Sequence, residues 1–111
     1  MTLPLNVYQK VVGIASTSPG IIYTAPIGYT GVILMGQVAN IGSTTERVLF
    51  SYLTTSTSTT TEIVPNSPVS GNDVIKLFSG KLFVLSGESL KISGTNGSNL
   101  KYTFSILETL N

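Results

Sequence analysis

The sequence predicts an all-β protein, an antiparallel β-sandwich or jelly-roll-like fold of roughly eight to nine short strands. Short apolar runs rich in Val and Ile recur at roughly 8–12-residue spacing, with Gly, Pro, Asn and Ser between them. No segment combines helical spacing of apolar residues with capping residues at its ends. One uncharged segment, residues 30–41, is apolar at both alternating sets of positions, which is typical of a buried strand.

Residues 30–41 are the segment around which we expect the fold to be organised. One set of positions holds Val32, Leu34 and Val38, and the other holds Ile33, Met35, Ala39 and Ile41. Since a half-exposed strand alternates apolar and polar residues, this strand is predicted to be covered on both faces. The β-branched residues and the internal Gly36 favour a strand over a helix. The second cover would be either another sheet or a neighbouring subunit.

Four strands are predicted in the first half of the chain. They are residues 6–17, with a bulge expected at Gly13, then residues 21–25, 30–41 and 47–54. Turn signals separate them at Ser18-Pro19-Gly20, at Pro26-Ile27-Gly28 and at Gly42-Ser43-Thr44-Thr45. The third of these strands is the apolar central one, and the fourth alternates well between its two faces.

The second half begins with two segments that we expect to be loops. Residues 55–61 are almost entirely Ser and Thr, and predict a loop that opens into a strand at about Thr60. Residues 65–72 contain two prolines and a glycine, which predicts the longest loop of the chain. Strands follow at residues 73–78, 81–85, 88–95 and 100–110. Asn96-Gly97 predicts a type I′ hairpin between the last two strands.

The composition points away from chemistry and toward association. Charged residues make up 10% of the chain, with a net charge of +1, whereas soluble domains average roughly 25% charged residues. Few charges and a net charge near zero favour association, so we expect a protein that works inside an assembly. The six basic residues are scattered singly, which argues against binding to nucleic acid.

No catalytic, cofactor-binding or metal-binding residues are predicted. The chain has no Cys and no His, which removes thiolate chemistry, the commonest general base and the commonest metal ligand. Its five acidic residues are not paired at short spacing, so a glycosidase-type pair of carboxylates is not expected. No apolar run reaches the ~18 residues of a membrane span, and residues 1–5 lack the features of a signal peptide. These observations predict a soluble protein made inside the cell.

Several segments, taken in order, resemble small all-β structural proteins of tailed bacteriophages, especially cyanophages. The segments are Asn6-Val7-Tyr8-Gln9-Lys10-Val11-Val12, Ile22-Tyr23-Thr24-Ala25-Pro26-Ile27-Gly28-Tyr29-Thr30, Gln37-Val38-Ala39-Asn40-Ile41, Ser79-Gly80-Lys81-Leu82, Leu85-Ser86-Gly87-Glu88-Ser89-Leu90-Lys91 and Phe104-Ser105-Ile106-Leu107-Glu108-Thr109. The resemblance implies a virion protein made in the host cytoplasm. Its partners would be the major capsid protein or other virion proteins, without a cofactor, nucleic acid or membrane.

The function that follows is that of a capsid decoration or cement protein, which docks on the assembled head and stabilises it. We expect it to act as a homo-oligomer, with a homotrimer favoured. Two alternatives remain open. One is a small tail, neck or fibre-tip component, and the other is a glycan-binding host-recognition module that stacks sugars on tyrosines. Residues 1–5 are interpreted as an N-terminal arm and residues 6–111 as a single β-sandwich domain. Docking is expected at segments without strand character, namely at Leu3, Pro4, Leu5, Thr55, Thr57, Thr59, Pro65, Asn66 and Pro68.

Overall fold

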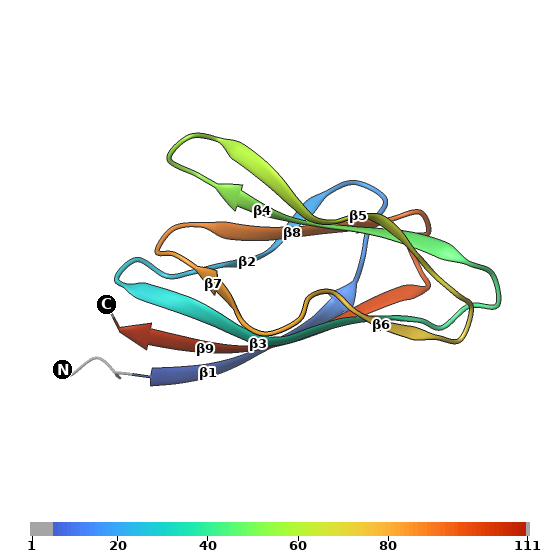
Figure 1. Cartoon of the computed structure of the whole chain (residues 1–111), viewed down its shortest axis with the longest axis horizontal. Coiled ribbons are helices and arrows are strands. Elements are labelled where there is room, and N and C mark those ends of the chain that lie inside the picture. The colour runs from blue at the N-terminus through green and yellow to red at the C-terminus, as the bar shows by residue number, and fades with distance from the viewer. Residues whose placement is uncertain (1–5, 111) are drawn as a thin grey trace.

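The computed structural model describes residues 6–110 and confirms the predicted β-sandwich (Figure 1). These residues form nine strands and no helix. The strands are β1 (Asn6–Ile14), β2 (Gly20–Thr24), β3 (Tyr29–Asn40), β4 (Glu46–Thr54), β5 (Thr59–Val69), β6 (Val74–Lys76), β7 (Leu82–Val84), β8 (Ser89–Gly94) and β9 (Leu100–Leu110). Within this part of the chain no helix has the length and apolar character that crossing a membrane requires.

The strands form two antiparallel sheets that pack face to face (Figure 1). The five-stranded sheet has the order β1-β9-β3-β6, and β7 pairs with β3 on the same edge as β6. The four-stranded sheet has the order β2-β8-β4-β5. Among the connections between these nine strands, only β4–β5 and β6–β7 stay within one sheet. The chain therefore passes repeatedly from one sheet to the other, which holds the two layers together.

The core lies between the two sheets and is built from the alternating inward-facing side chains of both. Phe50 of the four-stranded sheet and Phe104 of the five-stranded sheet are fully buried, with ring centroids 5.3 Å apart. Phe78, from the segment after β6, stacks on Phe50 at 6.2 Å. The other large, fully buried apolar side chains are Ile33, Val38, Val48, Val69, Val84, Leu90, Ile92, Leu100 and Ile106.

A buried amide fastens the end of β3 to the neighbouring segments. Asn40 is buried, and its Nδ2 donates to the backbone oxygens of Thr44 at 2.7 Å and Val69 at 2.9 Å. Its Oδ1 accepts from the backbone nitrogen of Gly42 at 2.9 Å. One side chain thus satisfies three backbone groups and fixes where β3 ends relative to β4 and β5.

The predicted hairpin at Asn96-Gly97 is wrong. β8 and β9 lie in different sheets, so the connection carries the chain across the sandwich and does not join paired strands. The chain does turn at this position, where Oδ1 of Asn96 accepts hydrogen bonds from the backbone nitrogens of Ser98 at 2.8 Å and Asn99 at 3.1 Å. This local side-chain turn explains the Asn without the positive φ that a type I′ hairpin needs.

The predicted loop over residues 65–72 is wrong for its first part. Pro65 and Pro68 belong to β5, which continues to Val69, and a turn follows it. β5 is an edge strand, so one of its sides pairs with no other strand. A proline is tolerated at such an edge because the backbone N–H that it lacks is not needed for pairing there. Its ladder with β4 is also irregular between Val48 and Ser51, which leaves Pro65 outside the register, whereas Pro68 is paired with Arg47. The expected start of the strand near Thr60 agrees with β5 beginning at Thr59.

The central strand, β3, has only one of its two faces covered by other parts of the same chain. A bulge between Ile33 and Met35 shifts the alternation, so Ile33 and Val38, which were predicted on opposite faces, both point inward and are fully buried beneath the four-stranded sheet. The opposite set is half-buried or exposed, and Leu34 is 39% exposed at a bulge between Ile33 and Met35. Of the two covers predicted for the second face, another sheet of the same chain is therefore wrong, and an apolar outer face remains uncovered within the described residues.

Candidate docking surfaces

The predicted docking residues fall into three groups, of which the first cannot be placed. Leu3, Pro4 and Leu5 lie outside the described residues. The other two groups both lie on the hairpin formed by β4 and β5.

Thr55, Thr57 and Thr59 form the second group, at the tip of this hairpin. Oγ1 of Thr57 donates to Oγ1 of Thr59 at 2.9 Å, and Oγ1 of Thr55 donates to the backbone oxygen of Gly87 at 3.2 Å. The tip is thus an exposed, hydrogen-bonded turn that presents hydroxyl and methyl groups but little apolar area.

Pro65, Asn66 and Pro68 form the third group and are exposed along the edge strand β5. The backbone oxygen of Asn66 accepts from Nη1 of Arg47 at 3.0 Å, which holds the strand against β4. Thr59 and Pro68 are nine residues apart on one strand, a separation of roughly 30 Å at the usual rise per residue. The structure therefore does not join the two groups into one compact site.

A different surface, the outer face of the five-stranded sheet, gathers most of the exposed large apolar side chains. We call it the apolar face. Its exposed members alternate with inward residues on β1, β3, β6 and β7, and are Tyr8, Val12, Ile14, Leu34, Val74 and Phe83. The outer face of the four-stranded sheet has Ile21 as its exposed large apolar side chain among the described residues.

One row of apolar side chains crosses the whole apolar face. The register places Tyr8 beside Leu107, Leu107 beside Val32, and Val32 beside Phe83. Cross-strand partners point to the same side of a sheet, so these four side chains form a continuous strip from β1 to β7. Tyr8 is 77% exposed and Phe83 is 57% exposed, so both ends of the strip are open to solvent.

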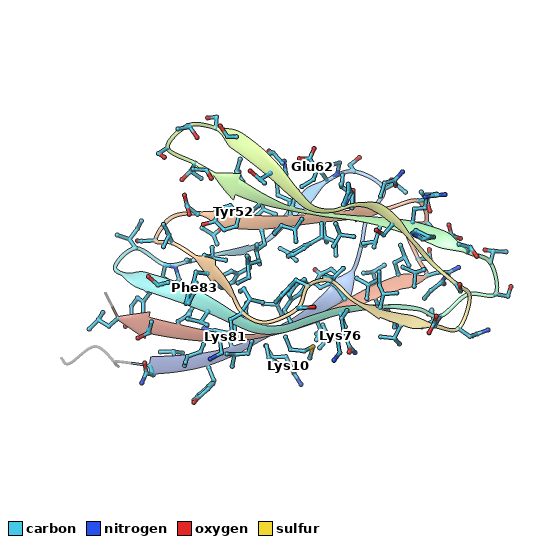
Figure 2. All side chains as sticks on the ribbon, in the orientation of Figure 1. Lys10, Tyr52, Glu62, Lys76, Lys81 and Phe83 are labelled. Carbon is cyan, nitrogen blue, oxygen red and sulfur yellow. The ribbon has the colours of Figure 1, made fainter. Side chains whose placement is uncertain are left out.

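The charges on the apolar face are all positive. Lys10, Lys76 and Lys101 are exposed at outward positions on β1, β6 and β9. Among the described residues at outward positions of this sheet none is acidic; Glu108 on β9 points inward and is buried. Figure 2 shows Lys10 and Lys76 on the lower side of the molecule, and Glu62 of β5 on the opposite side.

A shallow hollow interrupts the apolar face beside the β6 edge. It is lined by Leu34, Met35, Lys76 and Phe78, together with residues of the turn after β6. Apolar walls next to a lysine would accept a partner side chain with both apolar and acidic character.

A buried polar cluster links the two sheets near one end of the sandwich. The hydroxyl of Tyr23 on β2 donates to Oε2 of Glu108 on β9 at 2.7 Å, and Nε2 of Gln9 donates to Oε1 at 3.3 Å. Burial, together with the bond to the Glu108 carboxylate, raises the pKa of Tyr23 well above its usual value. The cluster contains no nucleophile paired with a base, and it serves to bridge the layers. No group of three or more metal-ligating residues occurs within the described part of the chain.

The apolar face could have been found from a signal already present in the sequence. Residues 30–41 are apolar at both sets of positions, and the second face was predicted to be covered by either another sheet or a neighbouring subunit. The outward positions on β1 and β9 hold both polar and apolar residues, such as Lys10 and Ser105 beside Tyr8 and Leu107. The sequences of these two strands therefore did not indicate an apolar face.

No protein-family model matches this sequence, and no curated protein is similar enough to it to count as a relative. Among solved structures, a protein of Bacillus endospore appendages, described as a novel family of disulfide-linked pili, has a similar fold. It superposes with a TM-score of 0.56 at 18% sequence identity, over 96% of this chain and 89% of that chain. The present chain contains no Cys, so the disulfide linkage of those pili has no counterpart in its sequence.

Proposed function

We propose that this chain is a structural protein of a bacteriophage virion that works by docking, as a decoration or cement protein on the assembled head. The observation that carries the proposal is the apolar face, a strip of aromatic and aliphatic side chains that its own fold leaves exposed. Contiguous exposed apolar surface of this kind is typical of protein interaction sites. The resemblance of its sequence segments to small phage proteins supplies the choice of a virion.

The mechanism would be stabilisation through contacts that exist only in the assembled shell. A protein that binds the assembled lattice and not the free subunits shifts the equilibrium toward the lattice. A symmetric homotrimer would present three such faces at once, which multiplies weak contacts through avidity. The sandwich suits this role because its two packed sheets hold the docking side chains in fixed positions.

The experiment that tests the proposal is to locate the chain in purified particles. Mass spectrometry of virions should detect it, and a particle reconstruction should place its two-sheet density on the head surface. Absence of the chain from purified virions would contradict the proposal.

A tail, neck or fibre-tip component is the second candidate. It is favoured by the similar fold of a pilus protein, which superposes on 96% of this chain. A pilus is a filament, so this fold occurs in a filament-forming protein. Electron microscopy of the purified chain separates the two candidates, because a filament component should form rods or rings on its own. A decoration protein should remain in small oligomers until heads are added.

A further inference from the structure

The geometry points to an acidic protein surface, belonging to a different chain, as the partner of the apolar face. This inference rests on the proposed function and specifies the partner that the docking surface takes.

The charges argue against a second copy of the same face as the partner. Lys10, Lys76 and Lys101 lie in three different cross-strand rows, and each row also contains an apolar side chain. These side chains are Met35, Val12 and Ile14, respectively. Two copies stacked face to face would bring six lysines together. The described outward positions of the sheet carry no carboxylate, and Asp73, exposed beside Val74 at the border of the face, supplies one carboxylate against three lysines in each copy. Like charges opposed across an interface are unfavourable, whereas an acidic partner can place a carboxylate near each lysine.

The area of the face suits a docking contact of modest size. Four strands at about 4.8 Å spacing and nine residues at about 3.3 Å rise give a surface of roughly 570 Å². A standard specific interface takes about 800 Å² from each partner. The face therefore provides most of one interface, and the hollow lined by Leu34 and Lys76 offers a place for a protruding partner side chain.

A protein surface fits the face better than an anionic membrane does. The sheet holds the side chains of Thr103 and Ser105 and the three lysines at the same level as the apolar strip. Inserting the strip into a bilayer would carry these polar groups to the same depth, at a cost that a membrane cannot offset with hydrogen bonds. A protein partner can pair each of them.

The test measures binding of the full chain to particles of the encoding phage that were assembled without it. The triple variant K10Q/K76Q/K101Q should bind about tenfold more weakly than the unaltered chain at ~0.15 M salt, and with a smaller dependence on salt. The matched control K91Q removes a lysine from the other sheet and should bind within about twofold of the unaltered chain.

A second pair of variants tests the apolar part. Val12 is 60% exposed on edge strand β1, and Ile21 is 58% exposed on edge strand β2. V12S should weaken binding about threefold to tenfold, while I21S should leave it unchanged. Circular dichroism melting curves of all variants check that the fold is retained.

The outcomes separate this inference from the proposed function. If the unaltered chain binds the particles and both V12S and the triple variant bind equally well, docking occurs elsewhere and the inference fails alone. If the unaltered chain does not bind, both fail. Lysine-dependent binding to phosphatidylglycerol vesicles in place of particles would assign the face to lipid and overturn the inference. Oligomers of the purified chain that V12S abolishes would assign it to a second copy and overturn it equally.

Discussion

Replacing Gly36 by alanine should destabilise the sandwich, because two aromatic rings lie against this glycine. Gly36 pairs with Phe104 across the strands β3 and β9. A Cβ at position 36 would lie 2.7 Å from Cε2 of Phe104 and 2.8 Å from Cε1 of Phe78. Both distances are shorter than real Cβ contacts, so at least one ring must move. Phe104 also packs on the buried Phe50, which restricts that movement.

The size of the effect follows from two opposing terms. Exchanging Gly for Ala restricts the unfolded chain and stabilises a compatible site by about 0.4–1 kcal/mol. Overpacking a core costs about 1–3 kcal/mol. Because the new Cβ would contact two rings, we expect the cost at position 36 to lie in the upper part of that range. The expected net loss is about 1–2.5 kcal/mol, a large share of the 5–15 kcal/mol that stabilises a typical domain.

Gly20, the first residue of β2, provides the matched control. A Cβ there would have its nearest neighbours, Oγ of Ser16 and the backbone oxygen of Ser18, at 4.0 Å. G20A therefore gains the entropic term without the overpacking. The two variants should differ by about 2–3 kcal/mol in the free energy of unfolding, measured by urea denaturation with circular dichroism. The corresponding difference in melting temperature is about 10–20 °C.

A double mutant identifies which contact matters. In a Phe78→Leu background the second ring contact is removed, so G36A should cost less than it does in the unaltered chain. If G36A and G20A have equal stability in the unaltered chain, the rings do not confine position 36 and the reasoning about this part of the core is wrong.

Three further predictions concern other parts of the sandwich. Asn40→Asp should lower the free energy of unfolding by about 2–5 kcal/mol in urea titrations at neutral pH, because a buried carboxylate would face two backbone carbonyl oxygens; a loss below about 0.5 kcal/mol would contradict this role. The raised pKa of Tyr23 means that the unfolded chain ionises first, so stability should be fully present below about pH 10 and fall above it; Tyr23→Phe should make the fall between pH 9 and pH 11 smaller, and an unchanged fall would count against it. Replacing both Pro65 and Pro68 by Thr should add backbone donors to an edge strand and increase self-association in light scattering; unchanged mass at high concentration would show that the prolines do not protect this edge.

The fold class was predictable from the sequence because alternation and turn residues are local signals. The turns after residues 79 and 86 are a case in point, since Gly80 and Gly87 adopt φ of 77° and 82°, which few other residues tolerate. The pairing of strands was less predictable. Asn96-Gly97 indicated a turn, but the local sequence does not determine whether the next strand pairs with the previous one or crosses to the other sheet.

The surface that we propose for docking was harder to predict than the fold. Loops were chosen because they lack strand character, and this choice led to Thr55, Thr57, Thr59, Pro65, Asn66 and Pro68. The apolar face is instead made of strand residues that lie far apart in the sequence, such as Tyr8 and Phe83. Its recognition requires the register of four strands, which sets which side chains share one side of a sheet.

If the apolar face docks as proposed, its area and charge favour docking at many equivalent places over docking at one. About 570 Å² on each partner, with roughly half of it apolar, corresponds to a gross hydrophobic gain of about 14 kcal/mol at about 25 cal/mol per Å². The loss of translational and rotational freedom on association costs an estimated 4–15 kcal/mol, so one isolated contact would be weak. Three faces that dock together on a symmetric shell bear that cost once, and the later contacts form at high effective concentration. A chain with few charges and one open apolar face is therefore suited to a surface that offers the same partner many times over.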